Sequence, residues 1–187
     1  MRGDKFNTNR MATDSGFIVW LTGLSSSGKT TLGRMLEANL RQRGLRVEVL
    51  DGEAIRKTLS PQLGFSKEDR DTHIRRIGFV SKLLSRNGIV SIVTAISPYR
   101  GTRDEIRQET ENFVEVYLRC PVETAMSRDS KGLYERALNG TLSCFTGISD
   151  PYEEPLCPEV LLDTDQQNEG ECLETLLSKL AELGYLP

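Results

Sequence analysis

Residues 17–31 read FIVWLTGLSSSGKTT, and this stretch decides the fold. Its first six residues form an apolar run between glycines, which predicts a strand buried on both faces. The next eight match the pattern GxxxxGK(S/T) in full, and a helical pattern follows them. A strand before and a helix after are the context of a phosphate-binding loop, so a chance match of a Ser-rich loop is disfavoured. The loop residues are Gly23, Leu24, Ser25, Ser26, Ser27, Gly28, Lys29 and Thr30.

Each part of this loop has its own chemical task. The glycines permit backbone conformations that turn several N–H groups onto phosphate oxygens. The helix N-terminus adds the positive end of its dipole. Lys29 can reach the β- and γ-phosphates, and the hydroxyl of Thr30 can ligate Mg²⁺. The sequence therefore predicts binding of a nucleoside triphosphate with Mg²⁺.

The rest of the chain predicts an α/β fold, because strand-like apolar runs alternate with helical patterns around a parallel sheet. The segment 129–158 is rich in Gly, Pro, Ser and charge and is too long for a simple connector, which predicts a mobile lid. We expect one kinase domain over residues 15–187 after a polar arm, residues 1–14, that is disordered. The expected strands are 17–22, 47–50, 89–96, 112–118 and 160–162. The expected helices run from the phosphate loop to 43, over 67–86, from 124 and over 173–183.

Composition narrows the partners and the compartment. The chain has 187 residues and a net charge of −3, which suits one domain and disfavours nucleic acid as a partner. No apolar run has the length of a membrane span or the character of a signal peptide. The four cysteines form no CxxC pair and the chain has one histidine. A zinc site or disulfide framework is therefore not expected, and a reducing cytoplasm fits.

A phosphate loop predicts nucleotide binding but not phosphoryl transfer, because switches, motors and kinases share it. A GTPase would carry an NKxD-type segment that reads guanine, and the sequence has none. A motor ATPase would usually have a strand that ends in Asp, whereas the third expected strand runs into Ser97 and Pro98. The short chain and the expected lid favour a kinase that acts on a small acceptor.

Acidic and basic residues follow the second expected strand. Asp51, Glu53 and Arg56 should face the cleft, because ligands in open α/β sheets lie beyond the carboxyl ends of strands. A carboxylate there can orient an acceptor hydroxyl, accept its proton or hold a water on Mg²⁺. The alternative is a structural role, in which Asp51 or Glu53 caps the following helix.

A second group of polar residues lies on the long helix expected over 67–86. Asp69, His73 and Arg76 fall on one stripe at i, i+4 and i+7 spacing. Such a stripe can hold an anionic substrate. A solvated surface with internal ion pairs, including a pair between His73 and Asp69, explains the same spacing.

Together these motifs resemble the adenylylsulfate kinases, which phosphorylate the 3′-hydroxyl of adenosine 5′-phosphosulfate (APS) with ATP. The resemblance spans residues 17–183 and implies a three-layer P-loop kinase fold, a homodimer, and formation of 3′-phosphoadenylyl sulfate (PAPS) in sulfate assimilation. The blocks that carry it are GLSSSGKTT, LDGEAIR, LGFSKEDRDTHIRRIGFVSKLL, ISPYR, RDSKGLYERA and FTGISDPYEEP.

The resemblance also implies roles for single residues. Residues 23–31, which include Thr31, and Arg128 would hold ATP, with Thr30 on Mg²⁺. Lys29, Asp51 and Ser97 would be catalytic. Some family members are described with a phosphoserine at the position of Ser97, but direct in-line transfer needs no covalent step, so we expect an acceptor contact there. The implied acceptor-binding residues are Asp51, Glu53, Arg56, Arg70, His73, Ile96, Ser97, Lys131, Gly132, Leu133, Phe145, Thr146 and Gly147, with Phe145 stacked on the adenine.

The sequence departs from the family pattern mainly on the acceptor side. Glu53 and Ala54 replace the second half of the DGDN segment, His73 replaces an asparagine, and the lid has lost a lysine and a glycine. If His73 contacts the acceptor, its charge should vary near neutral pH and the KM for APS should vary with it. Two further functions stay open: a relative that acts on another nucleotide-linked acceptor, and a weakly active nucleotide-binding module.

Overall fold

The computed structural model describes residues 16–187, so the arm predicted over residues 1–14 lies outside the described residues. Within residues 16–187, five parallel strands form one sheet in the order β2-β3-β1-β4-β5. This confirms the predicted α/β fold with a central parallel sheet. The strands are β1 (Ile18–Thr22), β2 (Val47–Asp51), β3 (Val90–Thr94), β4 (Phe113–Arg119) and β5 (Val160–Asp163).

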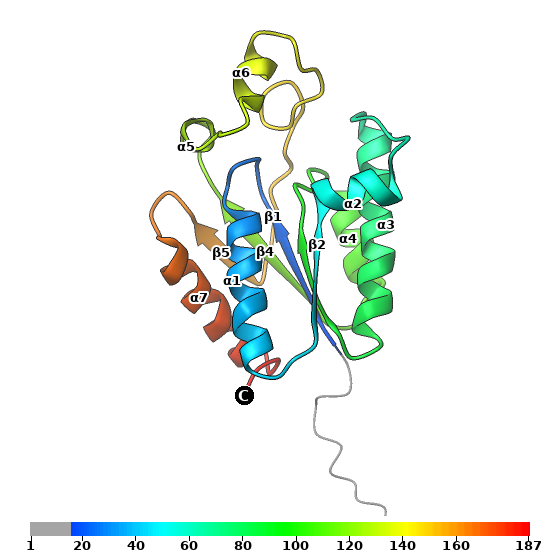
Figure 1. The fold of residues 1–187 in the computed structure, drawn as a ribbon, viewed down its shortest axis with the longest axis vertical. Coiled ribbons are helices and arrows are strands. Elements are labelled where there is room, and N and C mark those ends of the chain that lie inside the picture. The colour runs from blue at the N-terminus through cyan, green and yellow to red at the C-terminus, as the bar shows by residue number, and fades with distance from the viewer. Residues whose placement is uncertain (1–15) are drawn as a thin grey trace, which may run out of the picture.

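Helices cover both faces of the sheet and make three layers (Figure 1). On one face lie α1 (Lys29–Gln42) and α7 (Glu169–Glu182), and on the other lie α3 (Lys67–Ser85) and α4 (Arg100–Gln108). β1 connects the layers, because its alternate side chains point to opposite faces. Val19 and Leu21 join the core under α1 and α7, while Ile18 and Trp20 join the core under α3 and α4.

Three helices were not among those expected from the sequence: α2 (Gly52–Leu59), which entered only as the helix that Asp51 or Glu53 would cap, α4 and α6 (Leu133–Leu138). α4 reads RGTRDEIRQ, and Ile106 is its single aliphatic residue. The helix is nevertheless packed on the sheet, because it also buries Thr102 and Arg103 through hydrogen bonds. A helix that is held by polar contacts gives no apolar period to detect in the sequence.

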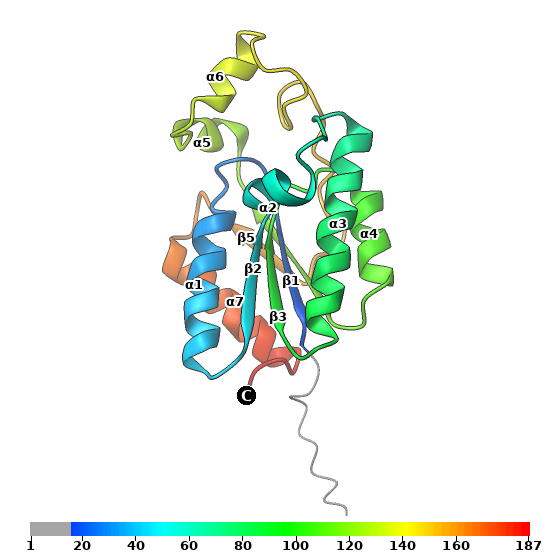
Figure 2. The same ribbon diagram turned by 45° about the vertical axis from the view of Figure 1, so that its right-hand side comes forward.

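The strands end where the functional segments begin. β3 ends at Thr94, two residues before the predicted end, and residues 96–98 leave the sheet as a loop that we call the acceptor loop. Most of the segment 129–158, the predicted lid, lies beyond the carboxyl edge of the sheet with α5 (Val122–Ser127) and α6, and its last residues run back beside the sheet to the start of β5 (Figure 2). It has its own apolar cluster around Tyr134 and Phe145. No helix within residues 16–187 combines the length and apolar character needed to cross a bilayer.

Candidate active site

The phosphate loop connects β1 to α1 through unusual backbone conformations. Gly28 is the N-cap of α1 with φ at 96°, and Gly23 has φ at 150°. A Cβ on Gly23 would come within 2.6 Å of the carbonyl oxygen of Leu118, so only glycine fits there. Ser26 also has a positive φ, of 60°. The loop is therefore shaped by the backbone, as the motif predicts.

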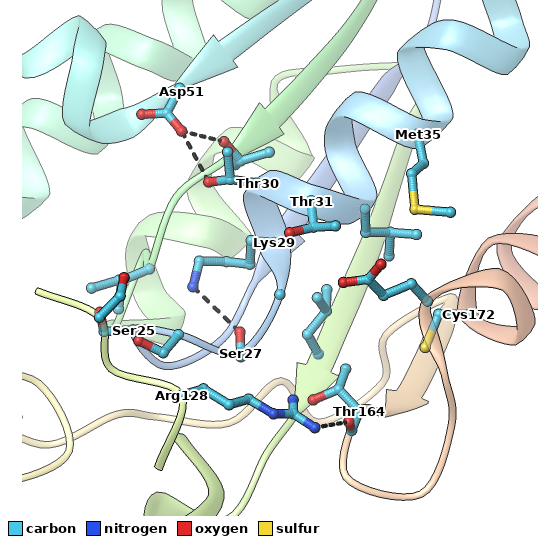
Figure 3. A pocket seen from close by; sticks show the side chains of 18 of the residues that line it. Ser25, Ser27, Lys29, Thr30, Thr31, Met35, Asp51, Arg128, Thr164 and Cys172 are labelled. Carbon is cyan, nitrogen blue, oxygen red and sulfur yellow. Dashed lines mark hydrogen bonds between the residues drawn. The ribbon is translucent and has the colours of Figure 1, made fainter. Parts of the chain in front are cut away.

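Lys29 is buried within its own loop. Its Nζ donates to the carbonyl oxygen of Gly23 at 2.9 Å and lies 3.4 Å from the Oγ of Ser27 (Figure 3). Burial lowers the pKa of Lys29 to about 7, against the opposing effect of nearby Asp51. Because a bound phosphate would supply negative charge, it would favour the protonated form of this amine.

The two carboxylate oxygens of Asp51 accept hydrogen bonds from two different parts of the site. Oδ1 caps α2 by accepting from the backbone N–H groups of Glu53 and Ala54, at 3.1 and 3.0 Å. Oδ2 accepts from the hydroxyls of Thr30 and Thr94, both at 3.1 Å (Figure 3). Burial alone would raise the pKa of Asp51, but these hydrogen bonds hold it below its usual value. The capping and cleft-facing roles that the sequence left open therefore coexist.

The nucleotide cavity lies between the phosphate loop and α7 and measures about 850 Å³. At its far end Arg128 lines the cavity and donates to the carbonyl oxygen of Thr164 at 2.8 Å (Figure 3). Arg128 was expected here, but its neighbours after the last strand were not, because their only signal in the sequence was that they follow the carboxyl end of that strand. The unexpected lining residues at this end are Thr164, Gln167, Asn168, Glu169, Gly170 and Cys172.

A smaller pocket of about 140 Å³ adjoins the nucleotide cavity, and we call it the acceptor pocket. The two share Glu53 and Ile96 as lining residues, so they are parts of one cleft. The structure thus brings most of the acceptor residues predicted from α2, α3 and the acceptor loop to one place. The predicted residues that line this pocket are Glu53, Arg56, Arg70, His73, Ile96 and Ser97.

Phe65 lines the acceptor pocket as well and was not predicted. Its side chain is 51% exposed, although it is a large apolar residue. The guanidinium carbons of Arg56 and Arg70 lie 4.9 and 5.4 Å from the ring centroid, which is cation–π geometry. An exposed aromatic ring that is held by two cations offers a stacking face to a planar ligand. The sequence signal was an aromatic residue just before the helix cap Ser66.

His73 corrects two expectations. Its Nε2 donates to the carbonyl oxygen of Gly52 at 2.9 Å, and its Nδ1 accepts from the hydroxyl of Ser60 at 3.0 Å. The alternative of a pair with Asp69 on a helix surface is wrong, because His73 is 3% exposed and Asp69 accepts from the backbone of Gly64. The change of charge near neutrality, which was expected if His73 contacts the acceptor, does not occur in this structure, because burial, together with nearby Arg56, lowers the pKa of His73 to about 4.

Ser97 lines the acceptor pocket but turns its hydroxyl into the protein. Its Oγ accepts from Nε1 of Trp20 at 3.0 Å, and the residue is 2% exposed. Its φ is 46°, a left-handed conformation that few residues other than glycine adopt. In this arrangement Ser97 shapes the backbone of the acceptor loop, and its hydroxyl is not presented to a ligand.

The lid contacts the rest of the protein at both parts of the cleft. Lys131 forms an ion pair with Glu53 across the opening of the nucleotide cavity. Arg70 donates to the carbonyl oxygen of Cys144 beside the acceptor pocket. These two contacts come from segments far apart in the sequence, and they connect the lid to α2 and α3.

The other predicted lid residues lie within the lid itself. Gly132 is the N-cap of α6 and has φ at 64°, and Leu133 is the first residue of that helix. Phe145 is buried and packs edge-on against Tyr134, with ring centroids 4.9 Å apart, so its ring does not lie in the acceptor pocket. Thr146 is buried with an unpaired hydroxyl among the described residues, and Gly147 approaches the side chain of Leu24.

A phosphate loop on a parallel sheet, a second pocket continuous with the nucleotide cavity and a lid over both define a P-loop kinase. The chain belongs to the adenylylsulfate kinase family: the family described as "Adenylylsulphate kinase" matches residues 15–163. This confirms the resemblance seen in the sequence.

Individual relatives agree with this assignment. The chain is 54% identical to the "Adenylyl-sulfate kinase" of Rippkaea orientalis over 171 residues, covering 91% of this chain and 94% of that protein. It is 55% identical to the "Probable bifunctional SAT/APS kinase 2" of Sorangium cellulosum, but it spans only 30% of that protein's length and 92% of its own. The solved "APS kinase CysC" of Mycobacterium tuberculosis "in complex with AMPPNP and APS" superposes with a TM-score of 0.84 at 36% identity, covering 89% and 98% of the two chains.

Proposed function

We propose that the chain transfers the γ-phosphate of ATP to the 3′-hydroxyl of APS and forms ADP and PAPS. The observation that carries this proposal is the cleft, in which the nucleotide cavity and the acceptor pocket share Glu53 and Ile96. Two ligands that occupy the two parts would meet beside Asp51. Membership of the family supplies the identity of the acceptor, and the relative solved with AMPPNP and APS shows that a protein of this fold holds both kinds of ligand.

Lys29 and Asp51 have different roles in a direct in-line transfer. Lys29 leaves the carbonyl oxygens of its loop for the phosphate oxygens and stabilises the charge that develops on the transferring group. Asp51 is ionised at neutral pH, because its hydrogen bonds outweigh the effect of burial and keep its pKa below the usual value for an aspartate. Its Oδ2 atom, at the edge of the nucleotide cavity, orients the acceptor hydroxyl and attracts its proton.

Mg²⁺ fits the oxygen atoms at this edge. The hydroxyl of Thr30 and the carboxylate of Asp51 lie 3.1 Å apart, and hard oxygen donors of this kind suit Mg²⁺. When bound, the ion would neutralise negative charge on the β- and γ-phosphates. Thr30 is the proposed protein ligand, and Asp51 would hold a coordinated water.

The small volume of the acceptor pocket supports a lid that moves when the acceptor binds. About 140 Å³ is well below the roughly 300 Å³ of the smallest usual ligand sites. Arg70, which lines the pocket, is bonded to the lid through the carbonyl oxygen of Cys144. We therefore expect acceptor binding to break this contact and to free Arg70, whose guanidinium suits an anionic group such as the phosphosulfate.

The proposal also covers the cellular compartment and the oligomeric state of the enzyme. We place it in the cytoplasm, where ATP and a reducing environment are available and cysteines stay free. We also propose a homodimer, as the family resemblance implies. Sedimentation equilibrium of the purified chain tests the dimer, and a monomeric mass at micromolar concentration would contradict it.

An acceptor screen with γ-labelled ATP tests the reaction. We expect label to move to APS at least about a hundredfold faster than to AMP or adenosine, because those lack the phosphosulfate that Arg56 and Arg70 can bind. Preference for another nucleotide-linked acceptor would support the related-kinase alternative. ATP binding with no transfer to any acceptor would leave a nucleotide-binding module. Lys29→Ala, purified in the same way, should transfer no label, and this result would exclude a contaminating kinase as the source of the activity.

A further inference from the structure

The acceptor loop, residues 96–98, is attached to the last part of the lid, which we call the return segment, residues 152–154. The backbone N–H of Glu153 donates to the carbonyl oxygen of Pro98 at 2.8 Å. The hydroxyls of Tyr152 and Thr22 are 2.9 Å apart, and Thr22 donates to the carbonyl oxygen of Ile96 at 2.7 Å. The loop that lines the acceptor pocket therefore shares its hydrogen bonds with the chain that descends from the lid.

Arg103 lies at the centre of this junction. Its Nη1 donates to the carbonyl oxygen of Ser97 at 2.5 Å, and its Nη2 donates to that of Glu153 at 2.6 Å. Its Nε donates to Glu115 on β4 at 2.8 Å. The guanidinium also lies over the ring of Tyr152, 5.8 Å from its centroid. One planar cation thus joins the acceptor loop, the return segment and the sheet.

The burial of Arg103 makes these contacts specific. The residue is 1% exposed and the side chain of Glu115 is 5% exposed, so the charge is compensated inside the protein. Ser97 holds a left-handed backbone conformation, which persists only where its surroundings fix it. The bonds from Arg103 to its carbonyl and from Trp20 to its hydroxyl supply that fixation.

We propose that Arg103 is a positioning residue for the acceptor: it holds the acceptor loop and the return segment in register, so that the end of the lid stays attached to the loop that lines the acceptor pocket. This inference rests on the proposed function. Arg103 does not line the nucleotide cavity. Its loss should therefore weaken acceptor binding and leave the affinity for ATP nearly unchanged.

The chain offers a matched control in Arg107, one turn further along α4. Arg107 also donates to Glu115, at 3.1 Å, and to Glu159, but those bonds connect α4 to β4 and to the segment before β5. Arg107→Lys therefore disturbs the same buried carboxylate without touching the acceptor loop or the return segment. Arg103→Lys keeps the charge beside Glu115 but loses the planar fork that reaches two carbonyls at once.

The test compares these two variants with the unmodified chain. We expect Arg103→Lys to raise the KM for APS about tenfold and the KM for ATP less than about twofold. A displaced contact mainly weakens the binding of the ligand that it positions. Hydrogen exchange at the amide of Glu153 should accelerate in Arg103→Lys. Arg107→Lys should show neither change. Equal effects of the two variants, or equal rises of both KM values, would overturn the proposal.

A second variant and a second readout keep the test decisive. If Arg103→Lys does not fold, replacing Arg103 and Glu115 together by Met removes the buried ion pair, which proteins often tolerate. The same exchange at Glu153 and the same selective rise in the KM for APS are then expected. The exchange measurement needs no acceptor. If APS proves not to be a substrate, it still shows whether Arg103 joins the two segments, so the failures of the two proposals are distinguishable.

Discussion

The phosphate loop and the acceptor pocket lie side by side in one cleft but are built in different ways. The loop is one continuous stretch that is shaped by its own backbone, with glycines at φ values that other residues avoid. The pocket gathers side chains from α2, α3 and the acceptor loop, and the lid contacts it. A local backbone structure tolerates few changes, whereas a pocket made of long-range side-chain contacts can be altered one residue at a time. The departures from the family pattern that the sequence predicts lie mainly on that second side, although Ser26 stands in the phosphate loop where the family commonly has glycine.

The largest effect is expected in the phosphate loop. Lys29→Ala should lower kcat by at least about a thousandfold, because it removes the cation that stabilises the transferring phosphoryl group. The fold should survive, because Lys29 bonds mainly to its own loop. Steady-state kinetics and circular dichroism measure the two outcomes. Turnover within about tenfold of the unmodified chain would exclude Lys29 from the chemical step.

Asp51 connects the two halves, and its change should have the next largest effect. Asp51→Asn keeps the shape and one carbonyl acceptor but removes the negative charge and the basicity. We expect kcat to fall about a hundredfold while the affinity for ATP stays within a few fold. Isothermal titration with a nonhydrolysable ATP analogue measures the second quantity. A loss confined to ATP affinity would mean that the carboxylate serves the nucleotide and not the acceptor.

The contrast between local backbone structure and long-range side-chain contacts also explains which elements could be predicted from the sequence. The strand, the loop and α1 follow from adjacent residues, so they were predicted almost to the residue. α4 could not be predicted, because Arg103 and Thr102 are buried through partners that are distant in sequence. From the sequence, the hydroxyl of Ser97 was expected to contact the acceptor. In the structure it accepts a hydrogen bond from Trp20, 77 residues away. Contacts of this kind depend on the tertiary fold and leave no local pattern.

His73 contributes to the acceptor side from inside the protein, through its hydrogen bonds to Gly52 and Ser60. Its ordinary pKa is 6.5 and its pKa in the fold is about 4, lowered first by burial. Between these values the unfolded chain binds a proton that the folded chain does not. Stability is therefore fully present above pH 6.5 and is lost progressively as the pH falls toward 4. His73→Asn should remove this contribution to the pH dependence.

Urea unfolding of both proteins at pH 7.5 and pH 5 measures this difference. The unmodified chain should lose more free energy of unfolding on acidification than His73→Asn does. The KM for APS should be governed by other groups between pH 6 and 8, because His73 stays neutral there. A pH-dependent KM that disappears in His73→Asn would mean that the imidazole is exposed to the acceptor and that the contacts to Gly52 and Ser60 are not kept.

The smallest effect concerns Lys131 and Glu53, the ion pair that links the lid to α2. Their side chains are 57% and 67% exposed, so water screens the attraction, and exposed pairs of this kind contribute about 0–1 kcal/mol. We expect Lys131→Met and Glu53→Gln each to change kcat/KM for APS only a few fold. A double-mutant cycle should give a coupling below about 1 kcal/mol that declines with added salt. A coupling above about 2 kcal/mol would show that the pair becomes desolvated when both ligands are bound. The acceptor side would then be fixed as firmly during turnover as the phosphate loop is by its backbone.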